Sequence, residues 1–430
     1  MKKKSPPASL KAEISQENFD KSQDYSRAKQ RFSWVYSSFS LVQELVEIKY
    51  NFMAKYWNLS SIILNGISPF LPGFAGGVIT KSLIFVLSST IIKTIIDLPF
   101  DYYSHFVLEE KYGFNKMSVK LWISDVFKEI LVASAIGGPV IGALLKIIEV
   151  YGDKFIYYAT GLLLFFTLLL QTIYPTVIAP LFNKFTTLED GELKTAIEDL
   201  AKKQNFPLTK LYKVDGSKRS SHSNAYFVGL PWSKQIVLFD TLIDHSSTEE
   251  VVAVLAHEIG HWQLYHLPKM MLYSQASLFF TLSLFNGFIN NKSLYNAFGF
   301  YKEYPIIIGF SLFAYLFQPI SALTSFSTNL LSRKHEYEAD AYAKKCGYEK
   351  ELASSLIKLS EENLSYVDAY WLYSAYHRSH PLLSERLDAL GFISTKQIGK
   401  GINPNEQKSE LVEEKVEDVK DNVKESIKQD

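Results

Sequence analysis

The sequence predicts an α-helical protein that crosses a membrane several times and carries a polar domain outside the bilayer. Two observations predict this: long windows without a charged residue, and a polar segment too long to be a simple connection between two of them. A helix that spans a bilayer needs about 20 apolar residues. Four windows meet that requirement: 56–80, 156–182, 270–291 and 304–332. Two weaker windows, 82–99 and 129–150, raise the predicted number of spans to six.

Two charged residues, Lys93 and Asp97, interrupt the window 82–99. Because they are four residues apart, they can pair on one helical face. Charges are costly in lipid, so the pair should face a cavity or a neighbouring helix. The alternative is that the span ends near Lys93 and the pair lies at the membrane interface.

The polar segment 183–267 should fold outside the bilayer. Apolar residues recur with helical spacing in 191–204. Apolar runs bounded by Gly, Ser and Pro predict strands at 208–214, 225–230 and 235–239. A further helix should begin near Ser247, where Ser247 or Thr248 can cap it. A second polar segment, 333–392, is helical by pattern, so the polar domain should be mainly helical with a small sheet.

The predicted helix after Ser247 carries His257-Glu258-Ile259-Gly260-His261, an H-E-x-x-H pattern. Residues four apart share a helical face, so His257 and His261 can both reach one zinc ion. Glu258 is then placed to take a proton from the attacking water. The alternative interpretation is a helix with two exposed histidines.

A catalytic zinc needs a third protein ligand, and the second polar segment supplies a candidate. Glu336 and Asp340 are four residues apart, so Glu336 can bind the metal while Asp340 accepts a hydrogen bond from a ligand imidazole. His335 and Glu338 compete for this role but point elsewhere on the helix. Two crossings separate the polar segments and put them on the same side. The alternative is a solvated acidic helix face.

The charged residues indicate on which side of the membrane the polar domain lies and which binding partners are excluded. The net charge is zero, from 45 basic and 45 acidic residues, so no overall field attracts nucleic acid. Basic residues gather on the side of the polar domain, which the positive-inside rule places in the cytosol. The single cysteine, Cys346, fits a reducing compartment.

The residues resemble those of the integral-membrane zinc CAAX prenyl proteases, the type I kind that includes prelamin-processing enzymes. The likeness runs from about Asn18 to Leu390 and includes GSKRSSHSNAYFVG at 216–229, far longer than a chance motif. It is also dense at 97–100, 109–115, 236–242, 257–262, 333–343 and 380–390.

The resemblance implies one Zn²⁺ per chain, with His257, His261 and Glu336 as ligands and Glu258 as the base. Asp340 matches the acid behind a ligand histidine. His380 and Arg386 match an H-P-x-x-x-x-R element that lines the site, where they could stabilise the oxyanion or hold the substrate carboxylate. Alternatively, His380 only begins a helix. The positions that match the substrate-facing strand are Asn224, Ala225, Tyr226 and Phe227.

That strand could pair with an extended peptide by β-augmentation, and the plain alternative is a core strand. Three other histidines, His222, His245 and His266, lack ligand spacing with the motif, so we expect them at the surface.

The family resemblance also implies a fold and a reaction. The fold is a gluzincin-like metallopeptidase domain that closes a large intramembrane chamber enclosed by helices. The reaction is removal of the last three residues from prenylated CAAX proteins. Membrane lipid and a monomeric state are implied, with the endoplasmic reticulum membrane and the nuclear envelope as locations.

Two other functions are compatible with the same motifs. A zinc protease for misfolded membrane proteins shares H-E-x-x-H and E-x-x-x-D. A non-enzymatic prenyl-lipid-binding protein would not need the full set of ligands and base.

The chain therefore divides into six segments. Residues 1–45 form a polar leader and membrane-proximal segment, although the family resemblance implies an additional span there. Residues 46–182 hold about four spans, and 269–332 hold two more. The metallopeptidase domain comprises 183–268 and 333–396, and 397–430 is a charged tail that we expect to be disordered.

Overall fold

The computed structural model describes residues 5–70, 77–230 and 233–394. The predicted tail, 397–430, lies outside these residues. The long helices are α1 (Gln16–Lys49), α2 (Phe52–Ile67), α3 (Val78–Tyr103), α4 (Val119–Tyr151), α5 (Phe155–Ile173), α10 (His266–Phe288) and α12 (Ile306–Lys345). Two short helices adjoin them, α6 (Ala179–Phe182) and α11 (Lys292–Ala297). The remaining α-helices are α7 (Glu192–Lys203), α8 (Asp240–His245), α9 (Thr248–Gln263), α13 (Glu349–Glu362), α14 (Trp371–His377) and α15 (Leu383–Leu390).

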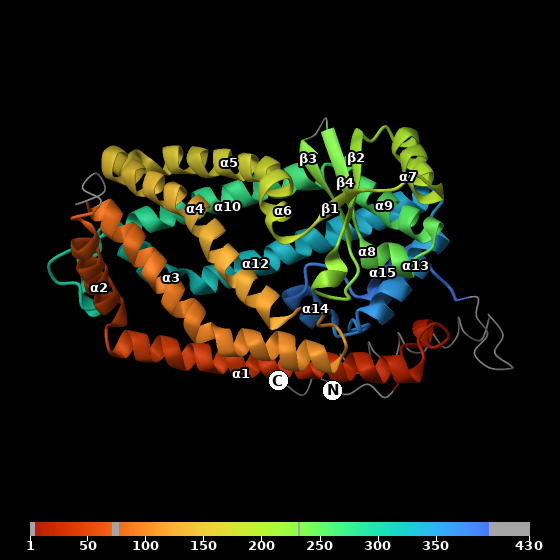
Figure 1. Ribbon diagram of the computed structural model, residues 1–430, viewed down its shortest axis with the longest axis horizontal. Helices are drawn as coiled ribbons and strands as arrows, with labels where there is room; N and C mark the ends of the chain where they lie inside the picture. Colours follow the sequence, from red (N-terminus) through yellow and green to blue (C-terminus); the bar gives the residue numbers. More distant parts are fainter. Residues whose placement is uncertain (1–4, 71–76, 231–232, 395–430) are drawn as a thin grey trace, which may run out of the picture.

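The long helices and the small sheet occupy opposite ends of the molecule. In Figure 1, α2 to α5 and α10 fill one end, the sheet and the short helices fill the other, and α1 runs along one side. Helix α12 extends from the helical end into the sheet end. The predicted span 304–332 and the second polar segment are thus joined in one continuous helix of 40 residues.

Three continuous helical stretches among the described residues are long and apolar enough to cross a membrane: Val78–Glu109, Val119–Phe182 and Ile306–Lys345. The window 56–80 does not form one helix, because α2 ends at Ile67 and α3 begins at Val78. The window 270–291 falls mostly in α10, which packs against α5 and α12 and is not among the three stretches. The number of spans therefore stays a prediction.

The sheet has the strand order β1-β2-β4-β3. Its strands are β1 (Phe185–Thr187), β2 (Leu208–Val214), β3 (Ala225–Leu230) and β4 (Ser233–Phe239). Strand β2 is parallel to β4, whereas β1 and β3 pair antiparallel with their neighbours, which leaves β3 at an edge. The predicted strands are confirmed, and β1 was missed because three residues show no alternation. Gly229 has φ +104°, and a Cβ there would lie 2.4 Å from the Ser233 carbonyl oxygen, so glycine is required.

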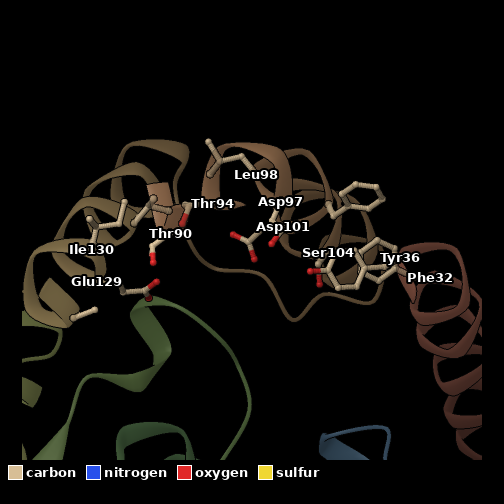
Figure 2. A pocket seen from close by; sticks show the side chains of 13 residues that line it. Phe32, Tyr36, Thr90, Thr94, Asp97, Leu98, Asp101, Ser104, Glu129 and Ile130 are labelled. Atoms are coloured by element: carbon tan, nitrogen blue, oxygen red, sulfur yellow. The ribbon is translucent and has the colours of Figure 1, made fainter. Parts of the chain in front are cut away.

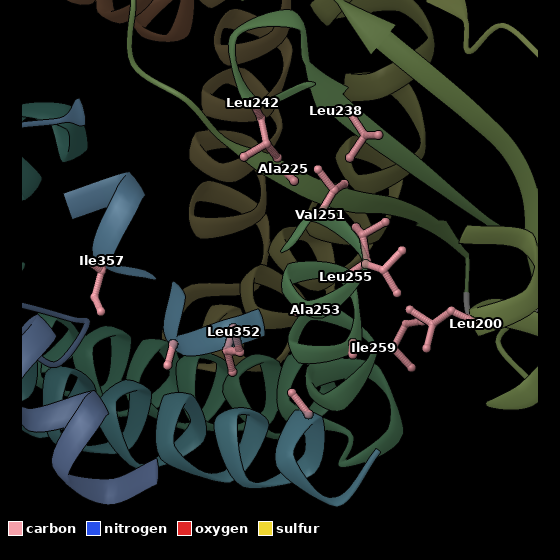
Figure 3. Packing of buried hydrophobic residues seen from close by; sticks show 14 of the residues in the cluster. Leu200, Ala225, Leu238, Leu242, Val251, Ala253, Leu255, Ile259, Leu352 and Ile357 are labelled. Carbon is pink, nitrogen blue, oxygen red and sulfur yellow. The ribbon is translucent and has the colours of Figure 1, made fainter. Parts of the chain in front are cut away.

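One apolar core unites the sheet with α7, α9, α13 and α15. Figure 3 shows α9 contributing Val251, Leu255 and Ile259 to this core beside Leu238 of β4. The predicted polar leader also takes part, because Leu10, Ile14 and Phe19 are buried in the same core. The N-terminal segment is therefore anchored to the polar domain by apolar contacts.

Cavities lie between the long helices. One of about 490 Å³ is bounded by α1, α3 and α4, and Figure 2 shows Asp97, Asp101 and Glu129 on its wall. A second, of about 510 Å³, lies between α1, α2, α3 and α12. The ion pair predicted in the window 82–99 is present, with Lys93 Nζ 3.1 Å from Asp97 Oδ2. Both residues line cavities, as expected for charges among membrane helices.

Candidate metal centre

Helix α9 begins with a capping box. The Ser247 hydroxyl accepts a hydrogen bond from the Glu250 amide at 3.3 Å, and the Glu250 carboxylate accepts one from the Ser247 amide at 2.9 Å. Two α13 side chains also donate to this carboxylate, Ser354 at 2.7 Å and Lys358 at 2.6 Å. Burial opposes ionisation of Glu250, but these hydrogen bonds outweigh it and lower the pKa of the carboxyl. The start of the motif helix is therefore fixed to its neighbour.

The side chains of His257, His261 and Glu336 converge at the junction of α9 and α12. His261 Nε2 lies 3.2 Å from His257 Nε2 and 3.3 Å from Glu336 Oε1. His257 Nε2 lies 3.5 Å from Glu336 Oε2. Zinc bonds of about 2.0–2.1 Å in a tetrahedron place ligand atoms about 3.3 Å apart, so the three residues fit a metal ion.

The approach of the two helices depends on Gly260. A Cβ at this position would meet the Tyr342 Cβ at 3.1 Å and the Ala339 backbone at 3.2 Å. These contacts are tighter than nine in ten real Cβ contacts, so a larger residue would require the α12 atoms to give by a few tenths of an ångström. The glycine in the motif thereby allows Glu336 to reach the two histidines.

Asp340 lies one turn beyond Glu336 and contacts the outer nitrogen of His257. The distance between His257 Nδ1 and Asp340 Oδ1 is 2.8 Å. Burial favours neutral His257, but hydrogen bonds to Asp340 and Glu336 outweigh this effect and raise the pKa of His257 to about 9. The same contact fixes the Nδ1–H tautomer and leaves Nε2 to face the other two ligands.

Arg386 of α15 completes this arrangement by binding Asp340 from the other side. Its Nε and Nη2 donate to the Asp340 carboxylate at 2.8 Å and 2.6 Å. The Arg386 side chain is only 12% exposed, and its Nη1 lies 3.6 Å from Glu336 Oε2. The guanidinium is engaged by two protein carboxylates, so the geometry favours positioning Asp340 over holding a substrate carboxylate.

Glu258 differs from its neighbours because its carboxylate is not engaged. Within the described residues it forms no hydrogen bond or ion pair with another side chain. Burial raises the pKa of Glu258 above its ordinary value. A carboxylate that is free to exchange a proton beside three candidate ligands suits a general base.

His380 lies at the open side of the centre. Its Nε2 is 3.3 Å from Glu336 Oε1, while the side chain remains 65% exposed. The backbone here is held by Arg333, which donates to the His380 carbonyl at 3.3 Å and to Glu385 at 2.6 Å. His380 does precede helix α15, but its imidazole also faces the candidate metal centre.

Three of the four predicted substrate-binding positions lie in strand β3, and the fourth directly precedes it. Asn224, just before the strand, is exposed, whereas Ala225 is buried in the core. Tyr226 stacks edge-on with Phe239, and Phe227 contacts Phe206. The strand packs against α9 and, within the described part of the chain, pairs on one side only, with β4. An edge strand beside the motif helix is therefore present, while two of its side chains also serve the core.

The three histidines expected at the surface differ from one another. His245 is 47% exposed, as predicted. His222 is partly buried, stacks on Phe114 and lies 2.8 Å from Asn363 Oδ1. His266 is only 3% exposed, so its surface placement was wrong. Helical spacing could not reveal it, because α9 ends at Gln263 and Tyr265, with φ 57°, turns the chain back toward the centre.

Two family descriptions match consecutive parts of the chain and together cover most of its length. "CAAX prenyl protease N-terminal, five membrane helices" covers residues 1–184, and "Peptidase family M48" covers residues 187–393. The chain belongs to peptidase family M48. It is accordingly a multi-pass membrane protein and a metalloprotease, and its helical fold with a small sheet agrees with that membership.

Named relatives of this M48 member cover most of its length. CAAX prenyl protease 1 of Saccharomyces cerevisiae is 49% identical over 409 residues, covering 92% of this chain and 90% of that protein. The Homo sapiens CAAX prenyl protease 1 homolog is 40% identical over 422 residues, covering 89% and 88%. The crystal structure of S. mikatae Ste24p superposes with a TM-score of 0.84 at 50% identity, covering 90% of this chain and 92% of that one.

Proposed function

We propose that this M48 metalloprotease removes the C-terminal tripeptide from prenylated CAAX proteins or peptides. The observation that carries the proposal is the convergence of His257, His261 and Glu336 beside an unengaged Glu258. Relatives with 49% and 40% identity over nearly the whole chain are named CAAX prenyl proteases, which supports the substrate class.

The metal is one Zn²⁺ per chain, held by His257, His261 and Glu336. Two imidazoles and one carboxylate are a ligand set typical of catalytic zinc, and the distances among their atoms suit it. When bound, zinc polarises the scissile carbonyl and makes water a stronger nucleophile at neutral pH. Asp340 keeps His257 in the ligating tautomer, and Arg386 fixes Asp340.

Glu258 accepts the proton from the attacking water and delivers it to the leaving amine. Its raised pKa and lack of partners support this exchange of a proton. His380 donates a hydrogen bond to the oxyanion, because its exposed imidazole faces the centre at Glu336. Arg386 acts through Asp340 and the ligands.

The peptide binds in extended form along the free edge of β3. Main-chain groups of Asn224, Ala225, Tyr226 and Phe227 are the partners for this β-augmentation. The prenyl chain enters the space between the long helices, where the cavity walls carry apolar side chains beside the charged ones. Membrane lipid surrounds the protein, which acts as a monomer without nucleic acid.

We place the enzyme in the endoplasmic reticulum membrane and the nuclear envelope, with its catalytic side in the cytosol. The proposed domain division is a leader (1–45), about four spans (46–182), the split metallopeptidase domain (183–268 and 333–396), two further spans (269–332) and the tail (397–430). Helix α12 connects the last spans directly to Glu336, which supports assembly of the domain from its two parts.

Cleavage of matched peptides tests the function. A farnesylated CAAX peptide, the same peptide without the prenyl group and an unfolded membrane protein are offered to the purified enzyme, with and without a chelator. We expect release of the tripeptide from the farnesylated peptide only, and its loss with chelator. Preferred cleavage of the unfolded protein would instead indicate a quality-control protease. Absence of all cleavage by the metal-loaded enzyme would indicate a lipid-binding protein.

A further inference from the structure

A second cluster of ionisable side chains lies directly behind the candidate metal centre. It consists of His266 at the start of α10, with His335 and Glu338 of α12. His266 and His335 are 3% and 4% exposed, and their rings stack with centroids 4.1 Å apart. No role in the reaction described above uses these residues.

The cluster is joined to the centre through His261. His261 Nδ1 lies 2.9 Å from His266 Nδ1, and His266 Nε2 lies 3.0 Å from Glu338 Oε2. His261 presents Nε2 to the other two candidate ligands, so its Nδ1 must carry the proton when Nε2 binds a metal. His261 Nδ1–H then donates to His266 Nδ1, and His266 Nε2–H donates to Glu338.

We propose that His266 and Glu338 are positioning residues that hold His261 in the ligating tautomer and orientation. The inference rests on the proposed metal site and deepens it. Glu338 sets the His266 tautomer, and His266 in turn accepts the proton of the ligand imidazole. The left-handed backbone of Tyr265, φ 57°, returns the chain after α9 so that His266 lies against His261.

The two ligand histidines are then supported differently. His257 donates directly to the carboxylate of Asp340, which is 2% exposed. His261 reaches its carboxylate through an intervening neutral imidazole, and Glu338 is 37% exposed with Lys334 Nζ 3.8 Å away. The buried carboxylate of Asp340 thus supports His257 directly. The carboxylate that supports His261, that of Glu338, is partly exposed and acts through His266.

The same residues could instead bind a second metal, but their geometry is unfavourable. A metal lies close to the plane of each imidazole that binds it, along the nitrogen lone pair. The rings of His266 and His335 are nearly parallel, 8° apart, and stacked, so one ion cannot lie in both planes. Both nitrogens of His266 also already have partners.

Metal retention separates these possibilities. Full-length protein is loaded with zinc in detergent, and transfer of zinc to excess chelator is timed for wild type, His266→Phe, His266→Asn and Glu338→Leu. Phenylalanine keeps the stacked ring and removes both nitrogens, whereas asparagine restores an acceptor near the Nδ1 position. His335→Phe keeps the stack and lies outside the hydrogen-bond chain, so it is the matched control.

We expect His266→Phe to release zinc on the order of 10–100-fold faster, with a smaller effect for Glu338→Leu. His266→Asn should restore much of the retention, and His335→Phe should match wild type. In cobalt-loaded protein, the visible spectrum should change with His266→Phe and not with His335→Phe. If His266→Phe misfolds by circular dichroism, Glu338→Leu against His335→Phe still decides.

Wild-type retention in both His266→Phe and Glu338→Leu would overturn the proposal. Two zinc ions per wild-type chain, one of them lost in both His266→Phe and His335→Phe, would overturn it in favour of a second metal site. These outcomes are independent of the substrate, because zinc transfer is measured without cleavage. A wild-type enzyme that holds zinc and does not cut the farnesylated peptide would refute the proposed function alone.

Discussion

Buried charges are arranged differently in the peptidase part and among the long helices. In the peptidase part most of them are paired, with the candidate base Glu258 as the exception: Arg386 binds Asp340, Arg333 binds Glu385 and Lys358 binds Glu250. Among the helices, Asp97, Asp101 and Glu129 line an open cavity, where pairing is incomplete: Asp97 binds Lys93 through Oδ2 while its Oδ1 is buried without a hydrogen-bond partner, and Glu129 makes no hydrogen bond or ion pair among the described residues.

The difference indicates that the peptidase part and the long helices have different roles. Paired charges cannot reorient freely, so Asp340 and Arg386 hold the candidate ligands in fixed positions, as preorganised catalysis requires. Acidic groups on a cavity wall among apolar helices need water, because an unsolvated charge there is costly. We therefore infer a rigid catalytic end and a hydrated space between the helices. Changing Glu to Gln, which removes charge with little change in shape, tests both regions with one chemical perturbation.

The largest effect is expected for Glu258→Gln. An amide cannot accept the proton of the attacking water, so kcat should fall by at least about 10²–10⁴-fold. Bound zinc should stay at one per chain, measured by metal analysis of the same sample. Normal processing of the farnesylated peptide by this variant would refute the proposed mechanism.

The next effect concerns the ligand from α12. Glu336→Ala removes one of three protein ligands, so zinc per chain should fall and cleavage should be lost with it. Metal analysis after dialysis checks the prediction, with the exposed Glu149→Ala, far along α4, as a matched control. An unchanged zinc content would exclude Glu336 as a ligand.

Substitution of Arg386 tests whether its ion pair with Asp340 stabilises the catalytic end of the molecule. Arg386→Met keeps much of the side-chain volume but leaves the nearly buried Asp340 without its guanidinium partner. Removing one member of a buried pair typically costs about 3–5 kcal/mol. Denaturant unfolding should show a loss of this order, and zinc should dissociate faster. Unchanged stability with altered KM alone would instead assign Arg386 to substrate binding.

How much of the structure can be predicted from the sequence depends on how far apart in the chain the interacting residues lie. The H-E-x-x-H pattern, the Ser247 cap and the strands at 208–214 and 225–230 are local, and each lies where the sequence predicts it. Glu336 required a topological argument across two predicted crossings. The His266 contact depends on one left-handed residue between two helices, and no periodicity reports that. Likewise, composition marks the first residues as polar, although Leu10 and Ile14 are buried.

Substitution of Glu250 should have an intermediate effect on stability, and that effect should depend on pH. Glu250→Gln should destabilise the protein by about 1–3 kcal/mol, because the charged hydrogen bond from Lys358 is lost. The folded pKa lies below the ordinary value of 4.5, so the unfolded state binds protons more readily. The stabilisation is therefore complete above pH 4.5 and is lost as pH falls through the folded pKa. Unfolding curves of both proteins should converge in that acidic range, and a constant difference would contradict the assignment.

The smallest effect is expected at the cavity wall. Glu129 is exposed to the cavity and makes no hydrogen bond or ion pair among the described residues, so Glu129→Gln removes a charge that holds nothing in place. Stability should change by no more than about 0.5 kcal/mol, and zinc retention should match wild type. Glu250→Gln is the comparison, since it is the same substitution at a paired site. A loss at Glu129 as large as that at Glu250 would mean that the cavity charges are also structural, and that this end of the molecule is as rigid as the catalytic one.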